Sequence, residues 1–273
     1  MITISIVTYK TDTEELAKCL ASLNSNLVDN IYIVDNSSEK IMADFCAKQN
    51  KVIYIPSDNV GYGSGHNKAI RLALKTKAKY HLVLNSDVYF DPDVLKCLSD
   101  YMDNNKDVAQ VQPNILYPNG KMQYSCRLLP TPMDLIFRRF MPKSMAKKLN
   151  YRYTLEFCDH KNEFNVPYHQ GSFMLFRIDC LREVGLFDER FFMYPEDIDI
   201  TRRMHRKYKT MFVPQATVIH AHRAASYKSK KMLKIHIINM IRYFNKWGWI
   251  FDKERKTWNQ QLLNQLGYKQ NKQ

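Results

Sequence analysis

Residues 2–7 read ITISIV, and three runs of the same kind follow along the chain: IYIV at residues 31–34, VIYI at 52–55 and HLVL at 81–84. Each run is short, apolar and rich in β-branched residues, which is typical of a buried β-strand. The segments between the runs have the length and apolar spacing of helices: residues 13–25, 39–48 and 65–77. This alternation predicts an α/β fold, with a mixed, mostly parallel sheet flanked by helices on both faces.

The second half of the chain has a less regular pattern. Six prolines fall between residues 113 and 167, so helices in that stretch must be short or bounded. Beyond the prolines we expect the following elements: a strand at residues 173–178, a helix at 195–209, strands at 210–213 and 217–219, and amphipathic helices at 229–247 and 252–266.

Composition excludes several classes of protein. Hydrophobic residues make up 45% of the chain, which argues against global disorder. The six cysteines form no CxxC pair, which argues against a zinc or redox motif and fits a reducing compartment. The chain opens directly on a strand, and no apolar run reaches the ~20 residues that span a bilayer. We therefore expect a cytoplasmic protein, peripheral at the inner face of the membrane.

The net charge of +14 is concentrated at one end of the chain. Residues 1–100 carry a net charge of −1 and residues 101–200 carry none, whereas residues 201–273 hold 17 Lys and Arg against two acidic residues. Such asymmetry favours an extended anionic partner such as a phospholipid surface; the alternative is a solvated basic tail. Nucleic acid is not an expected partner, because no recognised nucleic-acid module is present.

Polar residues follow each of the four predicted strands. In an open parallel sheet, ligands bind beyond the carboxyl ends of the strands. The residues at those ends are Thr8 and Tyr9, then Asp35, then the segment 59–67, and finally Asn85, Ser86 and Asp87. Their convergence predicts one binding crevice. It is more specific than any single motif within it.

Two of these strand ends carry a carboxylate. Asp35 can accept a hydrogen bond from a nucleobase N–H or a ribose hydroxyl, but it can equally cap the helix or turn that follows. Asp87 leaves a buried strand, where a carboxylate can hold a divalent cation that bridges two phosphates. Its alternative role is that of a turn carboxylate before Asp91.

The segment NVGYGSGHNK at residues 59–68 has glycines at positions 61, 63 and 65. These glycines allow a close backbone approach, and the helix that follows can favour a phosphate at its N-terminus. The segment matches neither GxGxxG nor the phosphate-binding P-loop, so a Rossmann dinucleotide site is disfavoured. A plain flexible turn is the alternative.

A second polar cluster lies at residues 191–199, FFMYPEDID. Pro195 suits the first position of a helix, which places Glu196 and Asp197 in its first turn. Either carboxylate could act as a general base; the alternative is simple complementation of the helix dipole. We expect Asp199 and Arg203 to form a surface i,i+4 pair. His220 follows a short strand and would be a ligand if that strand ends near Asp87.

Together these motifs resemble family 2 glycosyltransferases of GT-A-like (Rossmann-like) fold, and most of all the rhamnosyltransferase-like members that build bacterial surface polysaccharides. The resemblance runs from residue 5 to about residue 226. Its pieces come in the family's order: SIVTYK (5–10), VDNSS (34–38), NVGYGSGHNKAI (59–70), LNSDV (84–88), QGSFML (170–175), VGLFDERFFMYPEDIDI (184–200) and VIH (218–220).

The resemblance implies a role for each candidate residue. The nucleotide would be bound by Thr8, Tyr9, Asp35, Asn67, Asn85 and Ser86. Asp87 would bind Mg²⁺ or Mn²⁺ on the diphosphate, and His220 would complete or flank that metal site. Asp197 would be the base, and Glu196 would contact the acceptor.

The implied reaction is a single inverting displacement. It moves a sugar from a nucleotide diphosphate donor, with dTDP-rhamnose as the leading candidate, to a saccharide acceptor; a lipid-linked saccharide is one candidate for that acceptor. The family's Asp-x-Asp is Asn85-Ser86-Asp87 here, so metal binding would rest more on the phosphates and His220. The usual Gly-Gly-Phe-Asp-Glu starts with Gly185-Leu186, which changes a turn near the acceptor. The alternatives are a sugar-nucleotide binder without catalysis and a basic nucleic-acid-binding protein, the second of which rests on the net charge alone.

The resemblance also suggests a division of the chain. We expect a catalytic domain over residues 1–226, with a nucleotide-binding half at about 1–112 and an acceptor half at about 113–226. A basic helical C-terminal extension would cover residues 227–273. Within residues 227–250, lysines alternate with apolar and aromatic residues, which is typical of a helix in a membrane interface. The alternative is a domain-packing helix with a solvated basic face.

Overall fold

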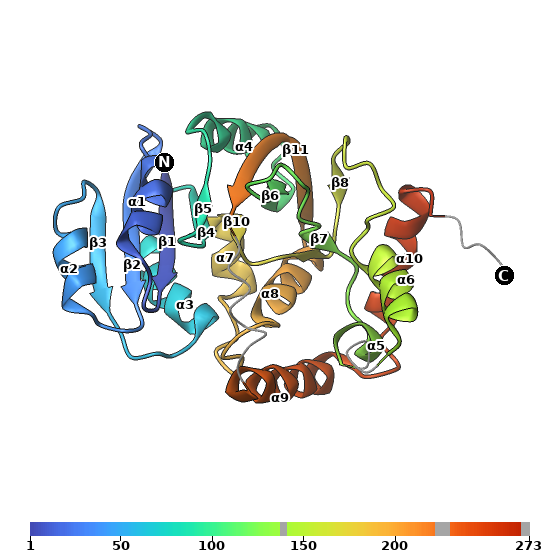
Figure 1. Ribbon diagram of the computed structural model, residues 1–273. Helices are drawn as coiled ribbons and strands as arrows, with labels where there is room; N and C mark the ends of the chain where they lie inside the picture. Colours follow the sequence, from blue (N-terminus) through green and yellow to red (C-terminus); the bar gives the residue numbers. More distant parts are fainter. Residues whose placement is uncertain (137–140, 222–229, 269–273) are drawn as a thin grey trace.

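The computed structural model describes residues 1–136, 141–221 and 230–268. Its centre is a mixed sheet, nine-stranded among the described residues, with strand order β3-β2-β1-β4-β10-β6-β11-β5 and β8 paired to β11. The first four strands in the chain are parallel neighbours: β1 (Ile2–Thr8), β2 (Val28–Asp35), β3 (Val52–Pro56) and β4 (Tyr80–Leu84). Figure 1 shows them on the left of the molecule. The predicted α/β architecture is confirmed.

Helices cover both faces of this sheet, because successive strand residues point to opposite sides. Ile31 and Ile33 of β2 belong to one core cluster, and Tyr32 and Val34 belong to another. The first cluster lies under α1 (Thr13–Ala21), α2 (Lys40–Cys46) and α4 (Asp93–Asn104). The opposite face is covered by α3 (Tyr62–Ala73), α7 (Ile178–Val184) and α8 (Glu196–His205).

In the right half of the sheet, parallel and antiparallel strands occur together. Strand β10 (Phe173–Arg177) runs antiparallel between β4 and β6 (Val108–Leu116), and β11 (Lys209–His220) runs parallel to β6. The short β5 (Val88–Tyr89) pairs antiparallel with the end of β11, so that Val88 lies opposite His220. This register brings the end of β11 beside Asp87.

Two differences from the sequence prediction have clear causes. Strand β6 was not predicted, because Gln110 and Gln112 interrupt its apolar pattern even though both side chains are buried. The two strands expected at residues 210–213 and 217–219 form one strand, β11, with a register shift between Val213 and Thr217. A bulge keeps the pairing continuous across the intervening residues.

The remaining elements form a second layer to the right in Figure 1. They are β7 (Cys126–Arg127), α5 (Pro132–Leu135), α6 (Lys143–Tyr153) and β9 (Tyr168–His169), and they pack in one cluster with β8 (Phe164–Asn165), the strand of the sheet that pairs with β11. Two C-terminal helices follow: α9 (Lys230–Trp247) runs along the bottom of Figure 1, below α8, and α10 (Lys253–Gln265) lies on the right. In the described ranges, no helix is both long and apolar enough to cross a membrane.

Helices α9 and α10 contribute to the core of this second layer. Tyr243 and Phe244 of α9 and Leu262 of α10 are buried in one cluster with Phe191 and Ile198. One apolar side of the C-terminal segment is therefore packed against the rest of the protein. The expected domain boundary at residue 226 lies outside the described residues, and the division of the chain there stays a prediction.

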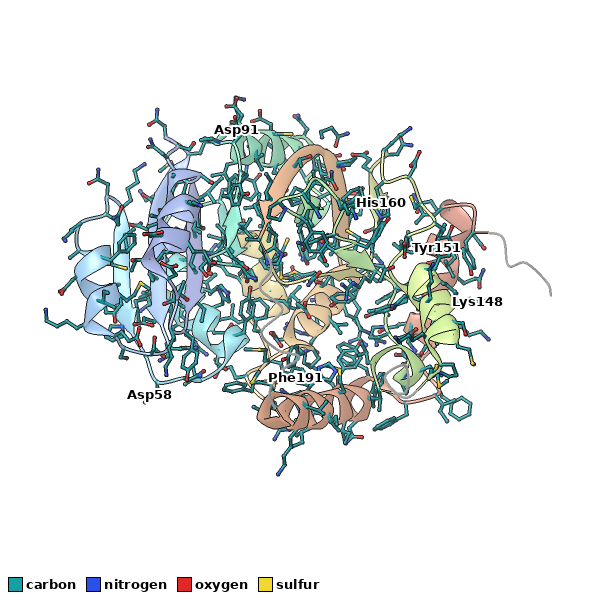
Figure 2. All side chains as sticks on the ribbon, viewed as in Figure 1. Asp58, Asp91, Lys148, Tyr151, His160 and Phe191 are labelled. Atoms are coloured by element: carbon teal, nitrogen blue, oxygen red, sulfur yellow. The ribbon has the colours of Figure 1, made fainter. Side chains whose placement is uncertain are left out.

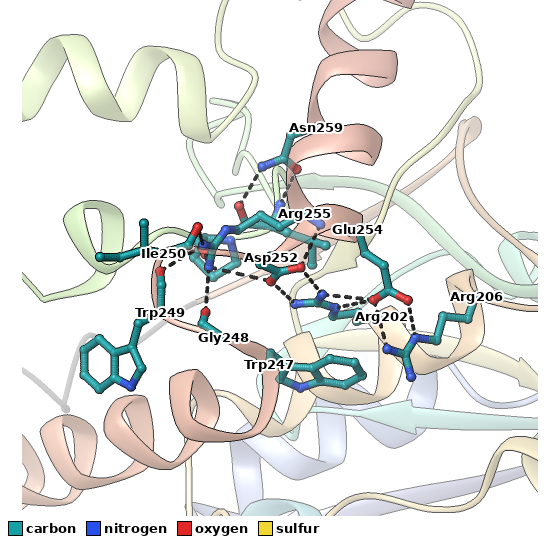
Figure 3. Close-up of polar contacts among 12 residues, drawn as sticks. Arg202, Arg206, Trp247, Gly248, Trp249, Ile250, Asp252, Glu254, Arg255 and Asn259 are labelled. Carbon is teal, nitrogen blue, oxygen red and sulfur yellow. Dashed lines mark hydrogen bonds and ion pairs between the residues drawn. The ribbon is translucent and has the colours of Figure 1, made fainter.

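A buried ion pair ties α10 to α8 (Figure 3). Arg202 donates two hydrogen bonds to Asp252, at 2.7 and 2.6 Å, and both side chains are almost fully buried. Glu254 accepts from Arg202 and Arg206, and the Trp247 ring lies 4.1 and 4.5 Å from these two guanidinium groups. A buried arginine without this partner would be strongly destabilising.

Candidate active site

The turn after β2 is organised around the carboxylate of Asp35. This buried group accepts hydrogen bonds from Thr8 Oγ1 (3.2 Å), Ser37 N (3.1 Å), Ser37 Oγ (2.7 Å), Glu39 N (2.9 Å) and Tyr54 OH (3.0 Å). Burial opposes ionisation, but the donated hydrogen bonds outweigh it and hold the pKa of Asp35 below its usual range. Asp35 therefore closes the turn before α2, and its contact with a nucleobase or ribose stays a prediction. Tyr9 is exposed beside it.

Asn67 holds a neighbouring loop in place. Its Nδ2 donates to Phe187 O (2.8 Å) and Glu189 Oε1 (2.9 Å), and its Oδ1 accepts from Phe187 N (3.0 Å). The side chain is buried, and these bonds engage both its nitrogen and its oxygen. A nucleotide contact by Asn67 stays a prediction.

The glycines of the 59–68 segment make close contacts with other parts of the protein. At Gly61, which has a φ of +94°, a Cβ atom would lie 2.2 Å from Phe192 O. The next amide, Tyr62 N, donates to that same carbonyl at 3.0 Å. At Gly63 a Cβ would press on Glu196. The glycines thus let the start of α3 lie against residues 192–196. The sequence suggested either a phosphate-binding loop or a flexible turn, and neither interpretation included this packing role.

Asp87 and His220 meet where β5 pairs with the end of β11. Asp87 Oδ1 lies 3.2 Å from His220 Nε2, and His220 Nδ1 lies 2.8 Å from Gln123 Oε1. Gln123 also donates to the backbone carbonyl of His220 at 2.9 Å, which fixes the ring from its far side. Within the described ranges, no group of three or more His, Cys, Asp and Glu side chains is placed to bind a metal.

A short chain of hydrogen bonds joins Asn85 to Asp197. The Tyr62 hydroxyl lies 3.0 Å from Asn85 Oδ1 and 2.5 Å from Gly171 O. The amide of Gly171 donates to Asp197 Oδ2 at 2.9 Å. A Cβ at Gly171 would lie 3.4 Å from the Asp197 Cβ and 3.5 Å from the Tyr62 ring, so these three residues are in tight contact.

Sequence reasoning assigned no role to Tyr62 or Gly171. Both were inside segments quoted for the resemblance, GYG and QGS, but only tertiary structure puts the two segments together. The turn after β2 joins the same chain, because Asn36 Nδ2 donates to Gly61 O at 3.3 Å. The structure thus connects the ends of β2 and β4 with the first turn of α8.

Glu196 and Asp197 are buried side by side at the start of α8. Burial raises the pKa of Asp197, while hydrogen bonds from the amides of Gly171 (2.9 Å) and Ile198 (2.7 Å) oppose the rise. Burial and the charge of Asp197 raise the pKa of Glu196 well above its usual range. Among the described residues, Glu196 Oε2 has no hydrogen-bond partner. We infer that the pair holds one proton, on Glu196, and one negative charge, on Asp197.

Arg127 is a further charged group near this pair. Burial opposes its charge, but Tyr168, Tyr153 and Asp197 favour it, so that the pKa of Arg127 lies above its usual range. Its Nη2 lies 3.4 Å from Gln170 Oε1, next to Gly171. Sequence reasoning missed Arg127, because it lies in the proline-rich stretch and in no recognised motif.

Helix α9 holds the loop that leads into the acidic pair. Tyr194 has a φ of +96°, a strained conformation for a residue other than glycine. Asn239 Nδ2 donates to Met193 O at 3.0 Å, and the Tyr194 ring meets the His236 ring edge-on at 4.7 Å. Phe191, whose label in Figure 2 lies just above α9, is buried against the inner side of this helix.

Asp199 is buried, so its expected place on the surface is wrong. The predicted bond to Arg203 is present at 2.9 Å, but Lys246 Nζ (2.6 Å) and Trp247 Nε1 (2.8 Å) also reach the carboxylate. Both of these partners come from α9, which covers that side of α8. An i,i+4 pattern on one helix cannot reveal a second helix packed over it.

Comparisons with known proteins agree with the motifs. The sequence model described as "Glycosyltransferase like family 2" matches residues 2–245. The rhamnosyltransferase WbbL of Escherichia coli K12 is 28% identical over 257 residues, which cover 89% of this chain and 92% of that protein. The N-acetylglucosaminyl-diphospho-decaprenol L-rhamnosyltransferase of Mycobacterium tuberculosis is 29% identical over 181 residues. That match covers 62% of this chain and only 57% of the relative.

Solved structures share the fold at low sequence identity. GalNAc-T7 with UDP, GalNAc and Mn²⁺ has a TM-score of 0.64 at 15% identity, over 94% of this chain and 50% of that one. The mannosyltransferase PcManGT of Pyrobaculum calidifontis, in complex with GDP-Man and Mn²⁺, has a TM-score of 0.57 at 13% identity. It covers 88% of this chain and 64% of that one. With its GT-A-like fold and these sugar-transferring relatives, the chain belongs to family 2 of the glycosyltransferases.

Proposed function

We propose that this glycosyltransferase is inverting and that it transfers rhamnose from dTDP-rhamnose to a lipid-linked saccharide during the synthesis of a cell-surface polysaccharide. The observation that carries this proposal is the hydrogen-bonded chain from Asn85 through Tyr62 and Gly171 to Asp197. This chain joins the end of β4, where we expect the diphosphate, to the acidic pair at the start of α8, where we expect the acceptor. The names of the relatives support rhamnose as the sugar.

The residues around Asp87 fit a divalent metal ion bound with the diphosphate. Asp87 Oδ1 and His220 Nε2 lie 3.2 Å apart, so a carboxylate oxygen and an imidazole nitrogen that face each other would hold the ion together with the phosphate oxygens. The hydrogen bond between Gln123 Oε1 and Nδ1 of His220 orients the ring so that its Nε2 faces Asp87. A site with two protein ligands leaves the other positions to phosphate oxygens and water, as Mg²⁺ and Mn²⁺ tolerate.

The chemical step needs a base for the acceptor and stabilisation for the leaving group. Asp197 accepts the acceptor's hydroxyl proton while that oxygen bonds to the anomeric carbon and the bond from this carbon to the diphosphate oxygen breaks. Glu196, which keeps its proton, can donate a hydrogen bond to the acceptor. A bound Mg²⁺ or Mn²⁺ would neutralise negative charge that develops on the departing nucleotide diphosphate.

Donor identity and the role of Asp87 can be tested together. Nucleotide release would be measured with dTDP-, UDP- and GDP-sugars in the presence of Mn²⁺, and we expect dTDP-rhamnose to be turned over fastest. Asp87→Asn should abolish the response to Mn²⁺, whereas the control Asp91→Asn alters only an exposed carboxylate. Preference for another nucleotide would overturn the donor assignment. A Mn²⁺ response that survives in Asp87→Asn would overturn the metal assignment.

A lipid-linked acceptor would keep the enzyme at the inner face of the membrane. We propose such a peripheral contact in the C-terminal segment expected from the sequence, residues 227–250. The concentration of positive charge beyond residue 200 supports it, since anionic lipids attract basic segments. Residues 227–229 lie outside the described ranges, so the argument rests on α9 and the residues after it.

A further inference from the structure

We propose that the turn Trp249-Ile250-Phe251, between α9 and α10, is the element of this protein that inserts into an anionic lipid surface. Phe251 is 96% exposed, Ile250 is 78% exposed, and Trp249 is 37% exposed. Adjacent large apolar side chains this exposed mark a binding surface more often than a chance feature. The inference rests on the proposed function for its purpose, but lipid binding itself does not depend on the donor or the reaction.

Three backbone carbonyls at and before this turn accept hydrogen bonds from one buried arginine. Arg255 donates to the carbonyls of Gly248 (3.2 Å), Trp249 (2.9 Å) and Ile250 (3.4 Å), as Figure 3 shows. Gly248 adopts a φ of +100°, which glycine tolerates without strain. Carbonyls that are bonded internally can leave water at little cost, whereas unpaired ones resist entry into an apolar medium. Pairing of these three carbonyls lowers the cost of burying this part of the turn in lipid.

One stripe of α9 extends this apolar surface. Leu233, Ile237 and Ile241 recur every four residues and are each between 37% and 39% exposed. The next position on the stripe is Asn245, whose Oδ1 accepts from the Trp249 indole at 2.8 Å. The stripe therefore continues from the helix into the turn.

The opposite side of α9 is occupied by the protein core. Tyr243 and Phe244, which the sequence pattern assigned to a membrane-facing helix, are buried there. Only part of α9 remains for a partner. This moves the centre of the expected lipid contact from the helix to the turn that follows it.

The charges around the turn favour an anionic surface. Asp252 and Glu254 are the only acidic residues between positions 230 and 268, and both are engaged by Arg202. The cations Lys234, Lys253 and Lys256 are exposed. Anionic phospholipid matches an apolar tip that is flanked by the exposed Lys253 and Lys256, with Lys234 further along α9, better than a neutral protein surface does.

Vesicle binding by the full chain tests this proposal. Co-sedimentation would be measured with phosphatidylcholine vesicles, with and without phosphatidylglycerol. We expect binding to the mixed vesicles, and at least about ten-fold weaker binding for the double variant Ile250→Ser/Phe251→Ser, because two large apolar side chains no longer leave water. The matched control is Ile41→Ser, which alters a 66% exposed side chain on α2 at the other end of the molecule (Figure 1).

Two further measurements separate the possible outcomes. Binding should shift the tryptophan emission of the wild type to shorter wavelength, and Trp249→Phe should remove most of that shift. Light scattering would detect a second copy on the same surface. Unchanged vesicle binding by the double variant, no binding by the wild type, or a dimer that the double variant alone disrupts would each overturn the proposal. Donor hydrolysis should be equal in all variants, so a wrong reaction assignment would be visible separately.

Discussion

The turn at Asp35 and the acidic pair at Glu196 and Asp197 are both buried, yet their electrostatics are opposite. Five hydrogen bonds reach Asp35, and its pKa lies below the usual range. Fewer donors reach the acidic pair, and both of its pKa values are raised, first of all by burial. Burial alone therefore does not decide the charge of a carboxylate; the number of donors does. One site holds a fixed charge, and the other can exchange a proton.

The two sites also differ in what supports them. The donors to Asp35 all lie between residues 8 and 54, on neighbouring strands and their turns. The acidic pair depends on Gly171 from one side and on the covering helices α9 and α10 from the other. A local framework and a framework of distant contacts should respond differently to substitution, in four measurable ways.

The largest effect is expected at the proton-exchanging site. Asp197→Asn should lower the turnover number by about 10²–10⁴-fold, because an amide cannot take the acceptor's proton. Donor binding should be nearly unchanged, since Asp197 contacts no expected nucleotide residue directly. Nucleotide release at saturating donor and acceptor measures the first quantity, and thermal shift with donor measures the second. Turnover within a few-fold of the wild type would remove Asp197 from the reaction.

The second effect concerns the distant support of α8. Asp252→Asn should lower the free energy of unfolding by about 3 kcal/mol, because Arg202 stays buried without its bidentate partner. Urea denaturation would measure it. Asp44→Asn is the control, since it breaks the exposed Lys40–Asp44 pair, which water and salt screen, and it should leave the free energy of unfolding nearly unchanged. Equal effects of the two substitutions would show that the α8–α10 ion pair does not support the site.

The same contrast explains what the sequence could predict. Strands β1 to β4 and their polar ends were predictable, because alternation and β-branched runs are local signals. His220 was expected to be a ligand on condition that its strand ended near Asp87, and the β5–β11 register meets that condition. Asp199 was misplaced because Lys246 and Trp247 are far away in sequence. Arg127, Tyr62 and Gly171 acquire their roles only through tertiary contacts.

The third effect tests the fixed charge at Asp35. Asp35→Asn should destabilise the protein by about 2 kcal/mol at neutral pH, because an amide cannot accept all the hydrogen bonds of the carboxylate. The folded pKa lies below the unfolded one, so the ionised group stabilises the fold above the unfolded pKa, and this stabilisation is lost as pH falls through the folded pKa. Urea midpoints at neutral and acidic pH would measure the change. A difference between variant and wild type that persists at acidic pH would contradict the assignment.

The smallest effect has the opposite sign and concerns Glu196. Its folded pKa is raised by burial and by the charge of Asp197, so its contribution to stability is complete below the unfolded pKa and is lost as pH rises through the folded pKa. The glutamine side chain of Glu196→Gln is uncharged at every pH, so the stability of this variant does not fall through ionisation at position 196. Relative to wild type, the variant should therefore gain stability on the order of 1 kcal/mol as pH rises from about 4 to neutral.

Measuring Glu196→Gln beside Asp35→Asn over one pH series makes the comparison between the sites direct. Both substitutions replace a buried carboxylate by its amide, so differences in shape or volume cannot account for opposite trends. If Glu196→Gln instead loses stability as pH rises, Glu196 is ionised in the folded protein. The negative charge of the pair would then reside on Glu196, and Asp197 would be the group that holds the proton. Such a result would exchange the two roles, because only the residue that is ionised at working pH can act as the base.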